Sequence, residues 1–265
     1  MSPPNDFPGG ISMRHHRRHL RRTAALTACL VAATVGLTAC GSEKDDKPKE
    51  PFAGMSGTEI VDKAVKATKG AESLKLAGEV SDDEESGPMK MNLALDTSGK
   101  CAGKLAVGDE GSFDLIVPGD KTVYVKYDEK FLRAQSKGQP KDETDAVVDM
   151  LAGHWAKTKA TGADAKDIAG MCDLDTLLED FGDVNSGARR GATTTLDGTP
   201  AIKINAHDAK DKYTLYVATE GKPYLLKIID RGVAEPEHLT FSDYDKPVKT
   251  APPAGKVLDI DKLGS

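Results

Sequence analysis

The sequence contains none of the short motifs that mark common catalytic sites. It has no Gly-x-Ser-x-Gly nucleophile turn, no phosphate-binding P-loop and no glycine-rich dinucleotide fingerprint. His154, His207 and His238 are far apart in the chain and form no His-x-x-x-His pair, so a metal site is not expected. We therefore predict a protein that is not an enzyme and that uses no cofactor.

An excess of positive charge is also lacking. Residues 1–39 hold five basic residues and one acidic residue, so the rest of the chain has 31 basic and 41 acidic residues, a formal charge of −10. This charge disfavours nucleic acid or an anionic lipid surface as an electrostatic partner, and any bound lipid is expected to be held by its apolar part. The acidic run Asp82–Glu85 lacks the ligand spacing of a calcium loop and is expected to be a solvated turn.

The apolar run near the N-terminus is too short to span a bilayer. Thr23–Gly36 has 14 residues, whereas a spanning helix needs about 20. It follows five arginines between Arg14 and Arg22, and this order is typical of a secretion signal. Met13 directly precedes the cationic region and is the expected translation start.

The four residues Leu37-Thr38-Ala39-Cys40 follow this run and resemble the lipobox of bacterial lipoproteins. The resemblance implies that residues 1–39 are a signal peptide, that Cys40 becomes the first residue, and that its sulfur carries a diacylglycerol. The new amino group would also be acylated, for example with palmitate. A lipid on Cys40 would anchor an extracellular protein to the outer face of the cell membrane. The alternative is an ordinary secreted protein whose cleavage site adjoins a cysteine.

The remaining sequence indicates a tether followed by one domain. Residues 40–54 are rich in charge and contain two prolines, so they are expected to be disordered. No linker rich in proline or serine divides residues 55–265, which are expected to form a single domain. Since Cys29 leaves with the signal peptide, Cys101 and Cys172 are the remaining pair, and outside the cell such a pair is typical of a disulfide. Two unpaired buried thiols are the alternative.

Three helices are predicted from capping and periodicity. Ser56-Gly57-Thr58-Glu59 is a capping box that begins a helix ending near Gly70. A second helix is expected near Asp145–Ala152. Asp173 is the candidate N-cap of a third helix, whose apolar face is formed by Leu174, Leu177, Leu178 and Phe181.

Most of the chain alternates between apolar and polar residues, as half-buried strands do. Tight turn signals between successive strands, among them Asp197-Gly198, predict antiparallel meanders. The tail from Pro247 is expected to dock on the domain. The expected strands are residues 74–80, 89–95, 101–107, 112–117, 121–127, a short one at 131–134, and then 192–196, 200–205, 213–219, 223–229 and 238–243.

These elements predict an α+β fold, mostly β, in which a strongly curved antiparallel sheet, a half-barrel, wraps a few helices. The inward positions of the strands carry roughly twenty-three large apolar residues against about eleven on the helices, and a sheet needs only one face covered. Two outcomes stay open: the sheet fills itself, or it leaves an apolar space for a ligand. The candidate lining residues of such a space are Leu76, Met91, Leu93, Leu115, Val125, Leu177, Phe181, Ile204, Leu215 and Leu226.

Three late segments also resemble a known family. They are Asp197-Gly198-Thr199-Pro200-Ala201, then Leu215–Thr219 with Gly221, Pro223, Tyr224 and Leu225, and finally Phe241-Ser242-Asp243-Tyr244. Behind a lipobox, this pattern resembles the actinobacterial LppX/LprG-type lipoproteins, which are related in architecture to the LolA and LolB carriers. The resemblance covers most of residues 55–265 and implies a bent sheet around an apolar cavity, which some members use to carry lipids or lipid-linked glycans.

Two functions remain in competition. The first is a monomeric cell-surface lipoprotein that binds or carries a lipid, a lipid-linked molecule or another apolar ligand under the curved sheet. The second is a membrane-tethered module for protein interaction or sensing that holds no small ligand. The first requires an apolar space, and the second requires an exposed apolar or acidic patch.

Overall fold

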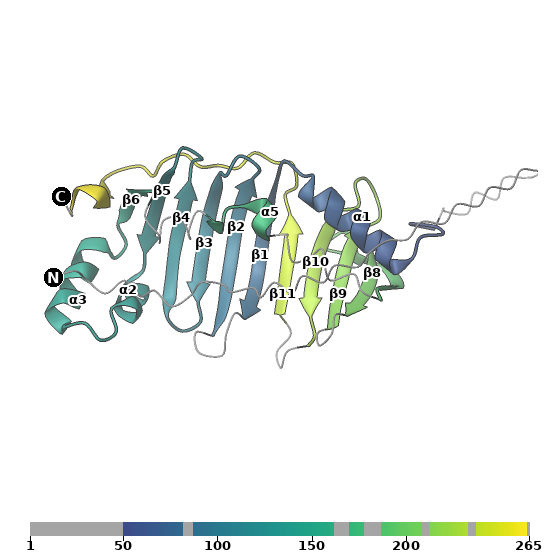
Figure 1. Cartoon of the computed structure of the whole chain (residues 1–265), viewed down its shortest axis with the longest axis horizontal. Helices are drawn as coiled ribbons and strands as arrows, with labels where there is room; N and C mark the ends of the chain where they lie inside the picture. Colours follow the sequence, from purple (N-terminus) through teal and green to yellow (C-terminus); the bar gives the residue numbers. More distant parts are fainter. Residues whose placement is uncertain are drawn as a thin grey trace, which may run out of the picture. The chain divides into compact units, whose positions relative to one another are not determined.

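The fold is organised around one open, curved sheet of twelve strands (Figure 1). It is seen in a computed structural model, which describes residues 50–81, 87–161, 170–177, 187–207, 212–232 and 237–263. By internal contacts the chain divides after Glu50, and Pro51–Ser265 form one compact unit. Cys40 and the acidic run Asp82–Glu85 lie outside the described residues.

The strands are β1 (Ser73–Ser81), β2 (Pro88–Asp96), β3 (Cys101–Val107), β4 (Gly111–Val117), β5 (Thr122–Tyr127), β6 (Trp155–Lys159), β7 (Arg189–Leu196), β8 (Thr199–His207), β9 (Lys212–Ala218), β10 (Leu225–Asp230), β11 (Glu237–Ser242) and β12 (Val257–Asp259). The helical elements are α1 (Gly57–Lys69), α2 (Glu129–Gln135), α3 (Lys141–Leu151), α5 (Leu174–Leu177) and the 3-10 turn η2 (Ile260–Lys262). Among the helices that the structure describes, none has the length and apolar character needed to cross a bilayer.

Two antiparallel meanders make up ten of the twelve strands of the sheet. Its strand order is β12-β6-β5-β4-β3-β2-β1-β11-β10-β9-β8-β7, so β1–β5 and β7–β11 each follow the chain. The meanders join where β11 pairs antiparallel with β1. Strands that follow one another through short turns pair antiparallel, because a parallel neighbour needs a long crossover. The predicted fold class, mostly β with a strongly curved antiparallel sheet around a few helices, is confirmed.

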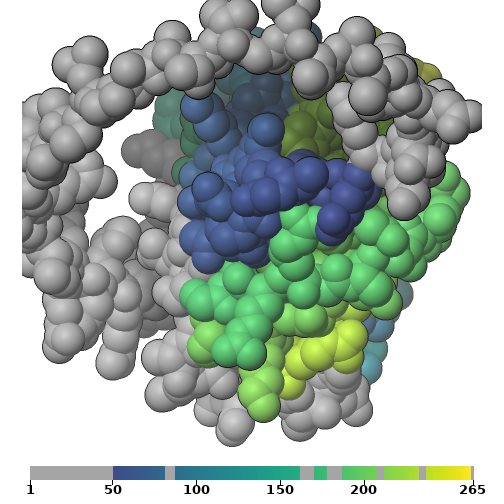
Figure 2. All heavy atoms as spheres, turned by 90° about the vertical axis from the view of Figure 1, so that its right-hand side faces the viewer, coloured from purple at the N-terminus to yellow at the C-terminus, as the bar shows by residue number. Residues whose placement is uncertain are grey.

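The capping box begins α1 as predicted. The Ser56 hydroxyl accepts a hydrogen bond from the Glu59 amide, and the Glu59 carboxylate accepts one from the Ser56 amide at 2.7 Å. These bonds satisfy amides that the first helical turn leaves without partners. Ile60, Val61 and Ala64 are fully buried, and α1 packs with them along β7–β10. Figure 2 shows the residues of α1 lying against the green strands at this end of the sheet.

The start of the compact unit is fixed by Arg190 of β7. Its guanidinium donates hydrogen bonds to three backbone carbonyls, those of Pro51, Phe52 and Met55, at 2.5–3.1 Å. These carbonyls belong to the turn that precedes α1. A planar donor with several N–H groups can hold such a turn without another side chain.

Between β5 and β6 one prediction was wrong, one predicted helix is present with an earlier start, and one strand was not predicted. Phe131–Ala134 was expected as a strand, but it lies in α2, because the Asp128 carboxylate caps that helix by accepting from the Phe131 amide at 2.7 Å. The helix expected near Asp145 begins earlier, at Lys141. The strand β6 was missed because its pattern, Trp155–Lys159, is short and half polar; it pairs with β5.

Glycines allow close backbone approach between neighbouring strands at two positions of the sheet. A Cβ on Gly78 of β1 would stand 1.9 Å from the carbonyl oxygen of His238, and a Cβ on Gly103 of β3 would stand 2.0 Å from that of Asn92. Neither position therefore tolerates a side chain without a shift of the neighbouring strand. Glycine at such places lets a sheet curve, because it removes the atom that would keep the strands apart.

The C-terminal tail docks on the sheet, as predicted. Strand β12 pairs parallel with β6 at the edge of the sheet. Asp261 follows it and accepts hydrogen bonds from the Thr158 hydroxyl at 2.8 Å and the Lys159 amide at 3.2 Å. The tail thus covers the backbone edge that β6 would otherwise expose.

A polar network at Asp245 holds the beginning of this tail. The Asp245 carboxylate accepts hydrogen bonds from the Tyr224 hydroxyl at 2.7 Å, the Lys222 ammonium at 2.9 Å and the Glu72 amide at 3.0 Å. The hydrogen bond from Tyr224, followed by that from Lys222, lowers the pKa of Asp245 to about 2. Tyr224 also stacks on Tyr244 with the ring centres 3.8 Å apart.

Candidate ligand-binding face and cleft

Cross-strand pairing aligns apolar residues into rows on the inner face, which is the face of the sheet that meets α1 and α5. One row takes a residue from each of six strands: Phe241, Leu76, Leu93, Gly103, Leu115 and Val125. The five side chains of this row are each at most 4 % exposed. The row lies in the middle of the first meander and continues the core of the second one.

The described helices cover the two meanders unequally. The 13-residue α1 packs on β7–β10. On the first meander the described cover consists of α2, with seven residues, which contacts β4, and α5, with four. The broad aliphatic face of β1–β5 is therefore met by two short described helices, whereas the face of β7–β10 is met by one longer helix.

A disulfide joins α5 to the inner face. Cys172 precedes this helix and is bonded to Cys101 at the start of β3, with the two Cα atoms 5.4 Å apart. Both cysteines are at most 1 % exposed. Asp173 caps α5 by accepting a hydrogen bond from the Thr176 amide at 2.9 Å, and Leu174 enters the core.

The predicted lining residues have three different placements. Six are fully or almost fully buried on the inner face, with 0–4 % exposure: Leu76, Leu93, Leu115, Val125, Ile204 and Leu215. Met91 and Leu177 are half-buried and pack against the same core. Leu226 does not join this core, because β10 has a bulge between Leu225 and Lys227 that directs Leu225 inward instead. Phe181 lies outside the described residues.

An aromatic cluster occupies one end of the inner face. Phe113 of β4, Tyr127 of β5 and Phe131 of α2 have ring centres 5.2–6.0 Å apart, and the rings of Tyr127 and Phe131 are stacked. Met89 and Met91 of β2 pack against the core as half-buried side chains. Methionine and aromatic side chains together form an adaptable apolar surface.

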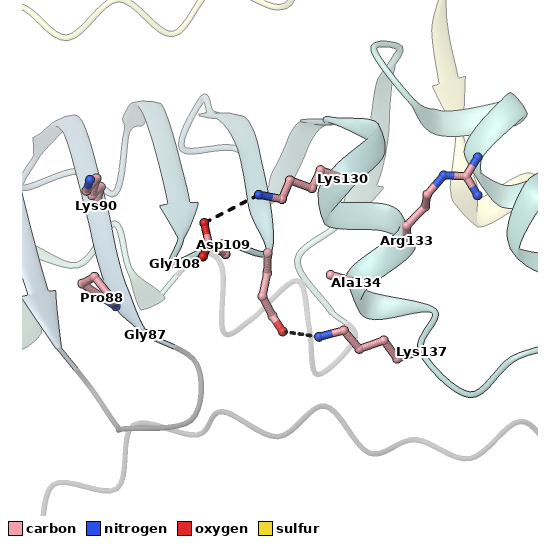
Figure 3. A pocket seen from close by; sticks show the side chains of 10 residues that line it. Gly87, Pro88, Lys90, Gly108, Asp109, Lys130, Arg133, Ala134 and Lys137 are labelled. Atoms are coloured by element: carbon pink, nitrogen blue, oxygen red, sulfur yellow. Dashed lines mark hydrogen bonds and ion pairs between the residues drawn. The ribbon is translucent and has the colours of Figure 1, made fainter.

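A cleft of about 720 Å³ lies between the start of β2, the turn from β3 to β4, and α2 (Figure 3). It is lined by Gly87, Pro88, Lys90, Gly108, Asp109, Glu110, Lys130, Arg133, Ala134 and Lys137. A smaller cleft of about 130 Å³ adjoins the disulfide at Asp96, Gly99 and Leu174. None of the nine predicted lining residues that the structure describes borders either cleft.

Ion pairs cross the larger cleft. Lys130 lies 3.8 Å from Asp109, and Lys137 lies 3.0 Å from Glu110 (Figure 3). Arg133 turns toward α3, where it bonds Asp145. Lys130 and Arg133 are three residues apart and so lie near each other on α2, and Lys137 follows the end of this helix. This spacing is visible in the sequence, but residues 131–134 were expected to form a strand, so a basic helical face was not predicted.

Asp128 joins α2 to β4. Burial alone would raise the pKa of Asp128, but the hydrogen bonds from the Ser112 hydroxyl and from the Phe131 and Ser112 amides lower it overall. The carboxylate is thus fixed as a charged N-cap and is not a candidate proton donor. Within the part of the chain that the structure describes, no three or more His, Cys, Asp or Glu side chains are grouped to hold a metal ion.

Comparison with known proteins gives the fold. No family model matches the sequence, and none of the curated proteins matches it. Among solved structures, LprF from Mycobacterium bovis is 16% identical with a TM-score of 0.51, and the match covers 75% of this chain and 97% of LprF. The lipoprotein LppX from Mycobacterium tuberculosis is also 16% identical, with a TM-score of 0.47, covering 74% of this chain and 98% of LppX. The sheet topology and the likeness to LprF together show that this chain has the same fold as LprF.

Proposed function

We propose that this protein is a lipoprotein, anchored to the outer face of the cell membrane through Cys40, that binds or carries an apolar ligand on the inner face of β1–β5. The proposed ligand is one or more acyl chains of a lipid or a lipid-linked molecule. The anchor rests on the lipobox-like residues 37–40. Residues 1–39 as signal peptide and 40–50 as tether belong to the same proposal. The tether was expected to reach residue 54, but residues 51–54 form the turn that Arg190 holds.

The unequal covering of the two meanders carries this proposal. The inner face of β1–β5 presents Leu93, Leu105, Leu115 and Val125, each at most 4 % exposed. Its described helical cover is α2 and the short α5, whereas the longer α1 serves β7–β10. An aliphatic face whose cover includes short separate helices can part from that cover and accept an acyl chain, because such a chain replaces the lost apolar contacts.

No reaction is part of the proposal. The apolar face offers dispersion contacts and exclusion of water, which hold a ligand without activating it. One copy of the chain is expected to bind the ligand by itself, so we propose that the protein acts as a monomer.

The experiment uses two matched tryptophan variants of the full chain. Leu115→Trp fills the inner face of β1–β5, and Ile204→Trp adds the same volume under α1. Both positions are nearly fully buried, and overpacking costs about 1–3 kcal/mol at such sites. Leu115→Trp should lower binding of a fluorescent acyl-chain probe several-fold, whereas Ile204→Trp should leave it unchanged.

Lipid extraction from the purified protein, followed by mass spectrometry, gives an independent readout. Extraction of stoichiometric acyl lipid would support the proposal. If no lipid is extracted and neither variant changes probe binding, the carrier function is wrong. Co-purification with a specific protein in place of lipid would then favour the membrane-tethered interaction module.

A further inference from the structure

The outer face of the sheet, opposite to the inner face, carries a charge of the other sign from the chain. Side chains alternate between the two faces of a strand, and the cross-strand register shows which positions share a face. Ten outward positions of the described strands are basic and four are acidic, although residues 40–265 together have a formal charge of −10. The basic positions are Lys75, Lys90, Lys104, Lys126, Lys157, Lys159, Arg189, Lys203, Lys212 and Lys227, and the acidic ones are Glu79, Asp96, Asp114 and Asp259.

Cross-strand pairs align many of these residues in two neighbouring rows. One row crosses nine strands and contains Lys203, Tyr216, Lys227, Thr240, Ala77, Asn92, Lys104, Asp114 and Lys126. The next row contains Lys75, Ala94, Ala102, Ile116, Tyr124 and Lys157. The outer face thus mixes lysines with small apolar and aromatic side chains.

The ion pairs of this face present their ammonium groups outward. The lysines of four such pairs have side chains that are 34–65 % exposed, and each carboxylate partner is less exposed than its lysine, at 23–35 %. Asp114 serves two of these lysines, Lys104 at 3.6 Å and Lys126 at 2.9 Å. A lysine stem can lie along the sheet while its charge stays in water. A partner therefore meets the ammonium groups before it meets the carboxylates.

The only tryptophan of the chain belongs to this face. Trp155 precedes Ala156, which is buried and pairs with Val125 of the inner face, so Trp155 points outward. The Lys126 ammonium lies over its ring, 5.2 Å from the ring centre. Tryptophan and tyrosine beside lysine are typical of surfaces at the headgroup level of a membrane, because their rings have an apolar body and a polar end.

The tether favours a membrane as the partner. Residues 40–50 span at most roughly 40 Å when fully extended. They lead to Pro51, whose carbonyl is bonded by Arg190 of the edge strand β7. A lipid on Cys40 would hold the sheet near the bilayer at an effective concentration on the order of millimolar. Weak attraction between ammonium groups and headgroups is then enough to orient the domain, whereas a free polyanion would have to bind from solution.

We propose that the outer face docks on the anionic phospholipid headgroups of the membrane that holds the Cys40 anchor. The place of docking rests on the proposed anchor, whereas the affinity for anionic headgroups does not. Docking in this way turns the inner face, with its proposed ligand, away from the bilayer. It revises the expectation that net charge disfavours an anionic lipid surface, because the local distribution of charge decides the contact.

The test uses residues 40–265 with Cys40→Ser. This chain holds the whole compact unit and has neither the lipid nor the arginine-rich segment. Flotation measures its binding to vesicles of phosphatidylcholine alone and to vesicles of equal parts phosphatidylcholine and phosphatidylglycerol. Fluorescence of Trp155, the single tryptophan, reports whether the outer face is the surface that meets the headgroups.

Two triple variants that lose the same charge are compared. Lys90→Gln, Lys104→Gln and Lys157→Gln together change the outer face and leave Lys126 over the Trp155 ring. The control is Lys63→Gln, Lys66→Gln and Lys69→Gln on α1, the helix that covers the inner face of β7–β10. Each lysine near an anionic surface changes binding roughly fivefold.

The parent chain should bind the anionic vesicles and not the neutral ones, with a shift of Trp155 emission to shorter wavelength. The outer-face variant should bind at least about tenfold more weakly, and the α1 control should stay within about twofold of the parent. An ionic strength of about 1 M, where the Debye length is about 3 Å, should release the protein.

Three results would overturn the inference: no binding to anionic vesicles, an equal loss in both variants, or binding that leaves Trp155 emission unchanged. Binding of soluble polyphosphate through the same lysines, without binding of vesicles, would also overturn it and would assign the face to a free polyanion. No anchor and no acyl ligand take part in this assay, so its result is separate from that of the lipid extraction that tests the proposed function.

Discussion

Replacing Cys101 and Cys172 together with alanine should lower the free energy of unfolding by roughly 4 kcal/mol. The two residues are 71 positions apart. In the loop-entropy relation, a cross-link that closes a loop of this length removes about 15 cal/mol/K of entropy from the unfolded chain, which is about 4.4 kcal/mol at 25 °C. Both side chains are buried, so the variant also loses a little packing.

Urea denaturation followed by circular dichroism measures this difference. The comparison requires that the free energy of unfolding falls with urea concentration at the same slope in the variant and the parent protein. Hydrogen exchange adds a local readout, since the amides of residues 170–177 should exchange faster once α5 is no longer bonded to β3. The control is the unchanged protein in reductant under native conditions. Its disulfide should persist, because both cysteines are at most 1 % exposed, and intact mass after alkylation reports this. A loss of less than about 1 kcal/mol would refute the loop-entropy reasoning.

Three further predictions concern other parts of the chain. Gly103→Ala should lower the free energy of unfolding by about 3 kcal/mol or more, measured by urea denaturation, because its Cβ would collide with the carbonyl of Asn92; unchanged stability would contradict the close approach. Because hydrogen bonds, first that from Tyr224, lower the pKa of Asp245 to about 2, its stabilising effect is present above the unfolded pKa near 4 and is lost as pH falls toward 2. The melting temperature should therefore fall more steeply between pH 4 and pH 2 in the parent protein than in Asp245→Asn. Equal slopes of melting temperature against pH in the two proteins would count against this. Cys40→Ser should move the protein from the membrane fraction to the medium, as fractionation and blotting would reveal, and retention would argue against the lipid anchor.

Local signals in the sequence predicted much of the fold. The capping box at Ser56–Glu59 fixes where α1 begins, because its partners are only three residues apart. Alternation in β1 to β5 and β7 to β11 identified the strands, since side chains on one face recur every second residue. The turn at Asp197-Gly198 places both residues at positive φ, as this hairpin signal predicts.

The segment after β5 shows where local reasoning fails. Phe131–Ala134 carries an apolar pattern too short to separate strand from helix. The decision came from Asp128, whose carboxylate caps α2 while also accepting from Ser112 of β4. A bond across 16 residues of sequence cannot be read from periodicity. The cationic face of α2 was missed for the same reason.

The sequence by itself determined the elements that depend on neighbouring residues: the helix caps, the alternating strands, the tight turns and the lipobox-like stretch before Cys40. Only the tertiary structure decided which residues meet across long separations. Lys104 and Lys126 meet at Asp114, Arg190 holds the turn before α1, and Leu225 replaces Leu226 in the core through a bulge. The physical reason is that local preferences are set within a few residues, whereas the covering of an apolar face and the grouping of charges depend on how distant segments pack together.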